Sequence, residues 1–162
     1  MIDRENMQRS LVLLKPDCVA RGLIGEVLGR FEKRGLRIVA MKMLKPSRAQ
    51  IREHYVEHLK KPFFPALYQY ITSGPMVVLV IEGKNAIELT RMMMGPTDCA
   101  KAAPGTIRGD LGKSMRMNII HGSDSEKSAR RETKIWFKTS EIIRTSVEDY
   151  HHVLAFEEGQ PL

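Results

Sequence analysis

The chain has 162 residues, 43% of which are hydrophobic, and its formal net charge is +7. This length favours one domain with its own core, and no apolar run approaches the roughly 18–20 residues of a membrane span, so we expect no membrane-spanning helix. The polar first ten residues do not resemble a signal peptide and the two cysteines indicate no disulfide framework, so we expect a cytoplasmic protein. The positive net charge either attracts a polyanion or belongs to a solvated basic surface.

The first half of the chain predicts two strands and three helices. Apolar residues recur at helical spacing between Leu23 and Lys33, which is typical of an amphipathic helix. Ser47 is of a type that often caps a helix at its N-terminus. In chain order we expect a buried strand at Ser10–Leu14, a helix at Leu23–Lys33, a strand at Leu36–Leu44, a helix from Ser47 to about Leu59 and a short helix at Pro62–Tyr70.

The second half predicts two more strands and a long connection. The segment Met76–Ile81 is apolar throughout, which favours a central strand. A connection of about 20 residues, such as Gly95–Met117, is uncommon unless it is functional. In chain order we expect the strand Met76–Ile81, a helix at Asn85–Met94, the loop Gly95–Met117 with short helical pieces, a strand at Asn118–Ile120, a helix at Asp124–Phe137 and a helical start at Ser140–Ile143.

Without the insertions, the order of elements is β-α-β-β-α-β, which is the split βαβ order of ferredoxin-like folds. We therefore predict an α+β fold, with a four-stranded antiparallel sheet and helices that cover one face of it. The whole chain, residues 1–162, forms one domain in this interpretation, with residues 1–9 and about 157–162 as loosely ordered ends. Translation could start at Met1 or at Met7.

The most informative segment is Asn118–Ser125, in which an apolar pair runs into His121 before Gly, Ser and Asp end the strand-like run. Ser123–Glu126 has the S-x-x-E form of a helix capping box. This places His121 at a junction of strand and helix, where backbone N–H groups favour anions. An unprotonated imidazole nitrogen there can attack a phosphoryl group. The alternative is a hydrogen-bonded histidine at a sheet edge.

Seven short sequence blocks, including the segment around His121, recur in an order and spacing that are typical of one protein family. They are Leu13–Asp17, Arg21–Glu26, Glu53–Tyr55, Lys61–Phe64, Ser73–Pro75, Ala103–Asp110 and Asn118–Ser125. Together they closely resemble the nucleoside diphosphate kinase family, from about Ser10 to about Phe137. The resemblance implies a phosphotransferase that moves the terminal phosphate of a nucleoside triphosphate to a nucleoside diphosphate by a ping-pong mechanism. It also implies Mg²⁺ on the nucleotide phosphates with no direct protein ligand, and a homo-oligomer, either a hexamer or a tetramer.

By the same resemblance, His121 carries the transient pros-phosphohistidine. Glu132 matches the glutamate that orients the imidazole, although it could also be a solvent-facing charge on its helix. Tyr55 matches a phenol near the transferred group. Ser123 matches a serine beside the histidine, and capping the following helix would be a sufficient role for it.

The resemblance also assigns residues to the nucleotide. Lys15 matches the lysine that contacts the phosphates and sugar, although a lysine after an apolar strand is normally solvated. Arg91 and Arg108 match two arginines that grip phosphates, for which a planar guanidinium is well suited. Thr97 matches a hydroxyl donor to a phosphate, and Asn118 matches a contact to a sugar hydroxyl. Taken alone, Arg91 would be a cation on a helix surface.

Phe63 matches the aromatic residue on which the base stacks, and Met115 falls where the family has an aliphatic residue on the other side of the base. We expect Phe63 at the cleft and Phe64 in the core. Stacking reads the face of a base and tolerates every nucleotide. His54 and His58 lie four residues apart on a predicted helix and could hold a metal ion, but the sequence shows no third ligand.

Two other functions compete with the kinase. A basic ferredoxin-like domain could bind single-stranded nucleic acid, but such a domain needs aromatic residues on its central strands. The predicted strands have none, and the aromatic residues gather between Tyr55 and Tyr70. Nucleic acid is therefore not expected as the main ligand. The third possibility is a catalytically inactive relative that serves protein contacts. It ranks last, because every residue that matches the family's site is present.

Overall fold

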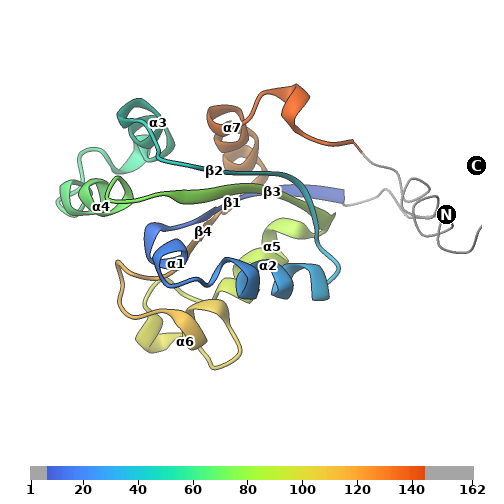
Figure 1. Ribbon diagram of the computed structural model, residues 1–162, viewed down its shortest axis with the longest axis horizontal. Coiled ribbons are helices and arrows are strands. Elements are labelled where there is room, and N and C mark those ends of the chain that lie inside the picture. The colour runs from blue at the N-terminus through green and yellow to red at the C-terminus, as the bar shows by residue number, and fades with distance from the viewer. Residues whose placement is uncertain (1–6, 145–162) are drawn as a thin grey trace, which may run out of the picture.

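The computed structural model describes residues 7–144, so the expectations for the two ends fall largely outside the described residues. Its centre is a four-stranded antiparallel sheet in the order β2-β3-β1-β4, with helices above and below it (Figure 1). The strands are β1 (Met7–Leu14), β2 (Arg37–Leu44), β3 (Met76–Lys84) and β4 (Ile120–Gly122). This sheet and the element order confirm the predicted ferredoxin-like α+β fold.

The helices lie on both faces of the sheet, so the expectation that they cover one face is wrong (Figure 1). In β1, Val12 and Leu14 face one core with α2 (Ile24–Lys33) and α5 (Ala86–Met94), whereas Leu11 and Leu13 face a second core with α3 (Arg48–His54), α4 (Phe64–Ile71) and α7 (Glu126–Trp136). The helices are α1 (Pro16–Ala20), α2 (Ile24–Lys33), α3 (Arg48–His54), α4 (Phe64–Ile71), α5 (Ala86–Met94), α6 (Ile107–Leu111) and α7 (Glu126–Trp136), with single 3-10 turns η1 (Val56–His58), η2 (Cys99–Lys101) and η3 (Thr139–Glu141).

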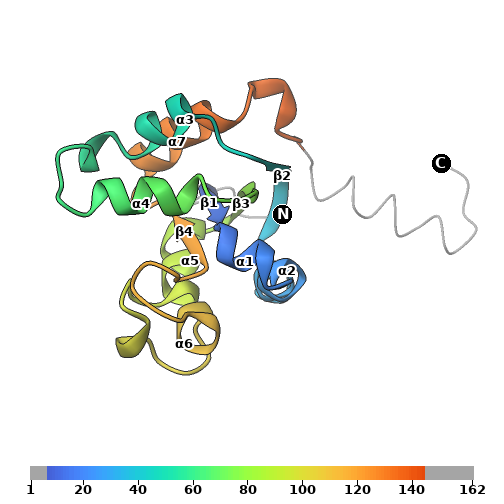
Figure 2. The same ribbon diagram turned by 60° about the vertical axis from the view of Figure 1, so that its left-hand side comes forward.

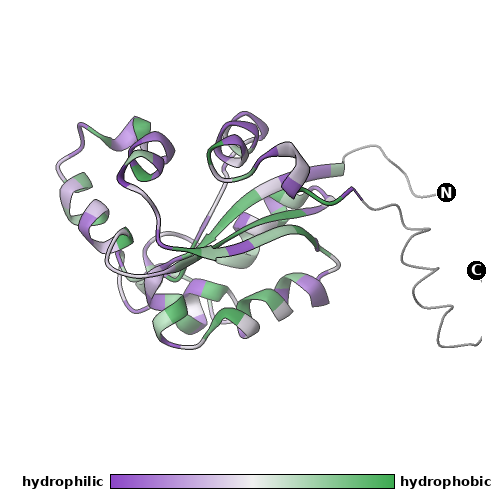
Figure 3. Cartoon of the chain, turned by 45° about the horizontal axis from the view of Figure 1, so that its top comes forward, coloured by the Kyte–Doolittle hydropathy of each residue, from purple (hydrophilic) through white to green (hydrophobic). Residues whose placement is uncertain are grey.

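The two cores explain why the central strands do not alternate between apolar and polar residues. Leu11–Leu14 and Met76–Ile81 are buried at every position, because both faces of these strands are covered. In Figure 3 the hydrophobic residues accordingly concentrate along the strands of the sheet. Within the described residues, no helix has both the length and the apolar character needed to cross a membrane.

The helix expected from Ser47 to Leu59 is shorter than predicted. Ser47 caps it as expected, in a capping box with Gln50, but α3 ends at His54 and η1 follows after Tyr55. Consecutive residues of a continuous helix point in different directions. The break at Tyr55 instead allows the rings of His54 and Tyr55 to lie within 6.1 Å of the same histidine ring, that of His121.

The segment around His121 also differs in detail from the prediction. The fourth strand begins at Ile120 instead of Asn118, so His121 lies in the middle of β4 and opposite Leu13 of β1. The N-cap of α7 is Ser125, whose hydroxyl accepts a hydrogen bond from the backbone N–H of Ser128. The predicted cap, Ser123, is fully buried and has other partners. The helical start expected at Ser140–Ile143 is the single turn η3.

Candidate active site

His121 and Glu132 form the centre of the candidate site. The Nε2 atom of His121 lies 3.2 Å from Oε2 of Glu132, and Glu132 is only 4% exposed on α7. Glu132 is therefore not a solvent-facing charge. A carboxylate accepts hydrogen bonds, so it keeps the proton of a neutral imidazole on Nε2 and leaves the lone pair on Nδ1. The arrangement leaves Nδ1 of His121 as the ring nitrogen with a free lone pair.

A chain of buried hydrogen bonds fixes the Glu132 carboxylate to the sheet. The hydroxyl of Ser123 donates to Oε2 of Glu132 at 2.7 Å and accepts from the backbone N–H of Leu11 at 3.2 Å. Leu11 belongs to the central strand β1. Ser123 thus anchors the Glu132 carboxylate to the central strand of the sheet. Ser123 does not cap α7, although we expected it to do so.

Two buried cations lie next to this centre. Lys15, 6% exposed at the end of β1, donates through Nζ to the side-chain oxygen of Asn118. Burial and the neighbouring positive charge of Arg108 lower the pKa of Lys15 to about 8. An anion bound beside Lys15 would offset both effects and favour its charged form.

Arg108 is 7% exposed on α6, and its guanidinium is held by backbone carbonyls. It donates to Gly95 at 2.9 Å and to Ile120 at 2.8 Å. Burial lowers its pKa, with a smaller contribution from the positive charge of Arg91. Among the described residues, Arg108 forms no hydrogen bond to a carboxylate. Its positive charge is therefore not neutralised by a protein anion and can interact with a bound anion.

The backbone between Asn118 and His121 forms a tight turn. Ile119 is buried and has a φ of 72°, a conformation that is rare for a β-branched residue. The N–H of Ile120 donates to the carbonyl of Asn118 at 2.8 Å, and the N–H of Lys15 donates to the carbonyl of Ile119 at 2.8 Å. This turn connects Asn118 to His121. Asp17, which the sequence analysis did not assign, accepts from the N–H of Ile119 at 3.1 Å.

The remaining predicted residues differ in how close they come to His121. The Tyr55 ring is buried, with its centroid 6.1 Å from that of His121, and burial raises the pKa of its phenol, which stays a hydrogen-bond donor. Phe64 is buried in the core as predicted, and Phe63 is 52% exposed. Arg91, Thr97 and Met115 are exposed, and no described hydrogen bond or ring contact joins their side chains to His121.

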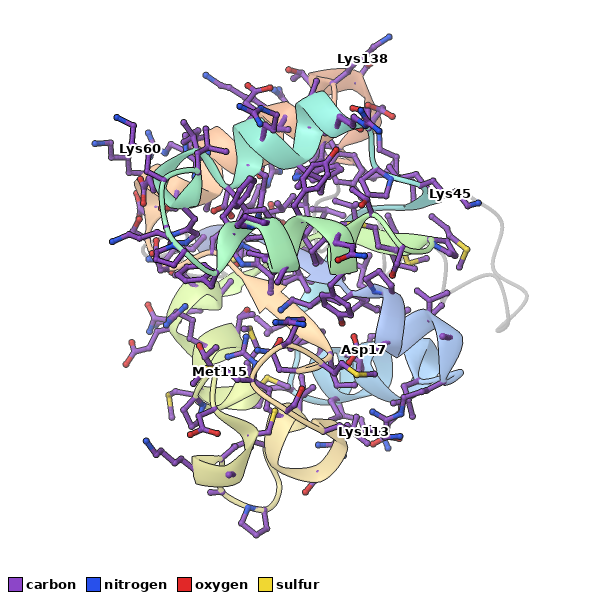
Figure 4. All side chains as sticks on the ribbon, turned by 90° about the vertical axis from the view of Figure 1, so that its left-hand side faces the viewer. Asp17, Lys45, Lys60, Lys113, Met115 and Lys138 are labelled. Carbon is purple, nitrogen blue, oxygen red and sulfur yellow. The ribbon has the colours of Figure 1, made fainter. Side chains whose placement is uncertain are left out.

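The exposed residues come from elements on the two sides of β4. Figure 2 shows α3 and α4 on one side of β4 and α6 on the other, and Figure 4 shows Met115 on the loop below α4. Asn118 ties this loop to the site, because its side-chain amide donates to the carbonyls of Thr97 at 3.2 Å and Met115 at 2.9 Å. Thr97 therefore meets the site through its backbone in this structure.

His54 also lies at the centre, and sequence analysis missed its role. Its ring contacts that of His121 edge-on, with the centroids 4.6 Å apart, and its Nδ1 accepts a hydrogen bond of 3.2 Å from the indole N–H of Trp136. A nitrogen of His54, a nitrogen of His121 and a carboxylate oxygen of Glu132 lie within 4.8 Å of one another. His58, which the sequence analysis considered with His54 as a metal pair lacking a third ligand, is not part of this group, and α3 ends between the two histidines.

Comparison with known proteins identifies the family. A family model described as nucleoside diphosphate kinase matches residues 8–142, which is most of the chain. This chain belongs to the nucleoside diphosphate kinase family. As a member of the family it is an enzyme that transfers phosphate between nucleotides.

Relatives and solved structures of nucleoside diphosphate kinases match over nearly their full lengths. The chain is 54% identical to a nucleoside diphosphate kinase of Archaeoglobus fulgidus over 88% of this chain and 95% of that protein. It is similar to the Halobacterium salinarum enzyme solved in complex with CDP, with a TM-score of 0.85, 42% identity and coverage of 90% and 97%. The Encephalitozoon cuniculi enzyme matches with a TM-score of 0.84, 36% identity and coverage of 90% and 99%.

Proposed function

We propose that this nucleoside diphosphate kinase works in two half-reactions through a phosphohistidine at Nδ1 of His121. The lone pair of Nδ1 attacks the terminal phosphorus of a nucleoside triphosphate, and the bond from that phosphorus to the bridging oxygen breaks. The electron pair leaves with the nucleoside diphosphate. A terminal oxygen of a second nucleoside diphosphate then attacks the phosphohistidine and restores the free imidazole.

The contact between His121 and Glu132 is the observation that carries this proposal. The proton stays on Nε2 beside the carboxylate throughout, while the ring becomes more positive as the N–P bond forms. A buried carboxylate at 3.2 Å stabilises that developing charge. Because Ser123 also holds the carboxylate, little reorganisation accompanies the reaction.

The cations serve the phosphates of the nucleotide. Lys15 and Arg108 are already fixed by Asn118 and by backbone carbonyls, so they meet phosphate oxygens in a preorganised position. Arg91 and the hydroxyl of Thr97 complete the phosphate contacts, and the Tyr55 phenol donates near the transferred group. Phosphoryl transfer depends mainly on such positioning and on charge neutralisation.

The exposed apolar residues serve the nucleoside. Phe63, at 52% exposure, and Met115, at 63%, supply apolar surface for the base, and Lys15 with Asn118 supplies polar groups for the sugar. Neither Phe63 nor Met115 reads hydrogen-bonding edges of a base. All common nucleotides are therefore substrates in this proposal.

The described residues fit a Mg²⁺ ion that the nucleotide carries, without direct ligation by the protein. Among the described residues, Glu132 is the carboxylate in contact with His121, and it is already engaged by His121 and Ser123. When bound to the phosphates, Mg²⁺ would neutralise negative charge on their oxygens. We further expect a cytoplasmic homo-oligomer, a hexamer or a tetramer, and sedimentation analysis would test the size.

Incubation with γ-labelled ATP, followed by acid or alkali, tests the proposal. The wild-type enzyme should retain label that survives alkali and is lost in acid, and unlabelled nucleoside diphosphate should remove it. His121→Ala should retain no label and should exchange no phosphate, with an unchanged circular dichroism spectrum because the side chain is partly exposed. Exchange by His121→Ala at the wild-type rate would show that the nucleophile is wrong.

A further inference from the structure

His54 lies against His121, but the proposed mechanism does not use it. His54 is 3% exposed at the end of α3. Its Nδ1 accepts a hydrogen bond from the indole N–H of Trp136, and an indole nitrogen can only donate. The lone pair of the ring is therefore on Nδ1 and the proton of the neutral ring is on Nε2. Burial, with smaller contributions from the positive charges of Arg131 and Lys15, lowers the pKa of His54 well below its usual value, which keeps the ring neutral.

The Nε2–H of His54 has no hydrogen-bond partner among the described residues, although it is buried. An unpaired buried donor is unfavourable, and few are found in native proteins. Here the donor belongs to a ring in edge-on contact with the nucleophilic ring of His121. A buried donor at this place is available to an acceptor that arrives with the substrate.

A metal ion would not satisfy this group. His54, His121 and Glu132 are the only set of three clustered potential metal ligands within residues 7–144, but a metal needs a lone pair. Binding through Nε2 of His54 would move the proton to Nδ1, where it would face the indole N–H of Trp136. The hydrogen bond from Trp136 thus selects a donor toward His121 and disfavours a metal ligand.

We propose that the Nε2–H of His54 donates a hydrogen bond to an oxygen of the phosphoryl group that is transferred to and from His121. The inference rests on the proposed phosphohistidine mechanism and adds a residue to it. No proton is transferred, because His54 donates the same hydrogen bond before and after the N–P bond forms. The bond is strongest when the phosphoryl oxygens lie next to His121, so it favours the transferred state over bound nucleotide.

Two matched substitutions separate this role from a structural one. His54→Gln can place an amide N–H about where Nε2 lies, but it gives up the acceptor for Trp136. His54→Asn can keep an acceptor for Trp136, since its amide reaches only the Nδ1 position, but it loses the donor toward His121. His54→Phe removes both. A purely structural role predicts that Asn restores activity, whereas the proposed role predicts that Gln does.

The measurement is single-turnover phosphorylation of each variant by ATP with Mg²⁺, together with the Kd for ADP. We expect His54→Phe and His54→Asn to slow phosphorylation by about 10²-fold, the usual effect of losing one such donor. His54→Gln should recover at least tenfold, with the Kd for ADP within twofold of wild type throughout. A folded His54→Asn that phosphorylates as fast as wild type would overturn the proposal.

A second measurement on the wild-type enzyme does not depend on whether the variants fold. In the ¹⁵N-labelled protein, the Nε2–H signal of His54 should move downfield and exchange more slowly with water when His121 is phosphorylated. A signal that is unchanged on phosphorylation would refute the role of His54 and leave the proposed function intact. If the wild-type enzyme acquired no phosphohistidine, the proposed function would itself have failed.

Discussion

The carboxylate of Asp17 accepts a 3.1 Å hydrogen bond from the backbone N–H of Ile119, the buried residue with a φ of 72° that stands two positions before His121. The same carboxylate accepts a hydrogen bond from the hydroxyl of Tyr70. A non-glycine residue in such a conformation costs about 1–3 kcal/mol and persists only when its surroundings hold it. Asp17 is therefore a positioning residue for the turn that carries Asn118 and His121.

Asp17→Ala should reduce both stability and activity. It leaves the buried N–H of Ile119 unpaired, which costs about 1–3 kcal/mol of unfolding free energy, and it releases the turn, so kcat should fall. Urea unfolding and steady-state exchange assays would measure the two effects. Asp17→Asn is the matched control, because its amide oxygen can still accept from Ile119. Equal stability of wild type and Asp17→Ala would contradict the role of Asp17.

Glu132→Gln should slow the phosphorylation of His121 while preserving the shape of the site. The neutral amide can still accept from Ser123 but no longer offsets the positive charge that develops on the imidazole. We expect a loss of about 10–10²-fold, smaller than that of His121→Ala, in single-turnover phosphorylation measured between about pH 5 and pH 9. Superimposable pH–rate profiles for the two proteins would show that the Glu132 charge does not act on His121.

Lys15 should make nucleotide binding depend on pH. Its pKa of about 8 in the free enzyme is below the ordinary lysine value, and bound phosphates raise the pKa by favouring the charged form. As the pH rises through 8, the free enzyme loses the positive charge, so the affinity for ADP should fall by up to about tenfold per pH unit.

Calorimetric titration of ADP from pH 7 to pH 10 would measure this dependence, and Lys15→Arg is the control. Arginine stays charged across this range, so the decline should be much smaller in that variant. The same decline in both proteins would assign the effect to another group.

Arg108→Ala should weaken nucleotide binding and slow transfer together. The loss of one preorganised charged contact costs about 2–4 kcal/mol in the transition state, and the carbonyls of Gly95 and Ile120 lose a donor as well. Exchange kinetics and thermal unfolding would separate the two losses. Arg108→Lys keeps the charge but cannot reach both carbonyls, so it should recover binding more than stability. Phosphorylation kinetics within twofold of wild type in Arg108→Ala would remove Arg108 from the site.

The sequence by itself determined the order of the elements and drew attention to the segment around His121. An apolar run such as Met76–Ile81 identifies a central strand, because a strand that is covered on both faces needs apolar side chains at every position. Ser47 and Gln50 form a capping box from neighbouring residues, so this feature needed no tertiary information. The segment around His121 could be singled out because its characteristic residues lie within one short stretch of the sequence.

Tertiary structure alone decided which distant residues meet. The sequence pattern favoured Ser123 as the cap of the last long helix, but Ser123 pairs with Leu11, 112 residues away, and the cap is Ser125. His54 and Trp136 are 82 residues apart, and Asp17 and Ile119 are 102 apart. Such pairs follow from how the strands align and how α3 and α7 pack on one face of the sheet. The secondary-structure preferences of neighbouring residues do not predict these contacts. The contacts nevertheless decide where protons and charges lie around His121.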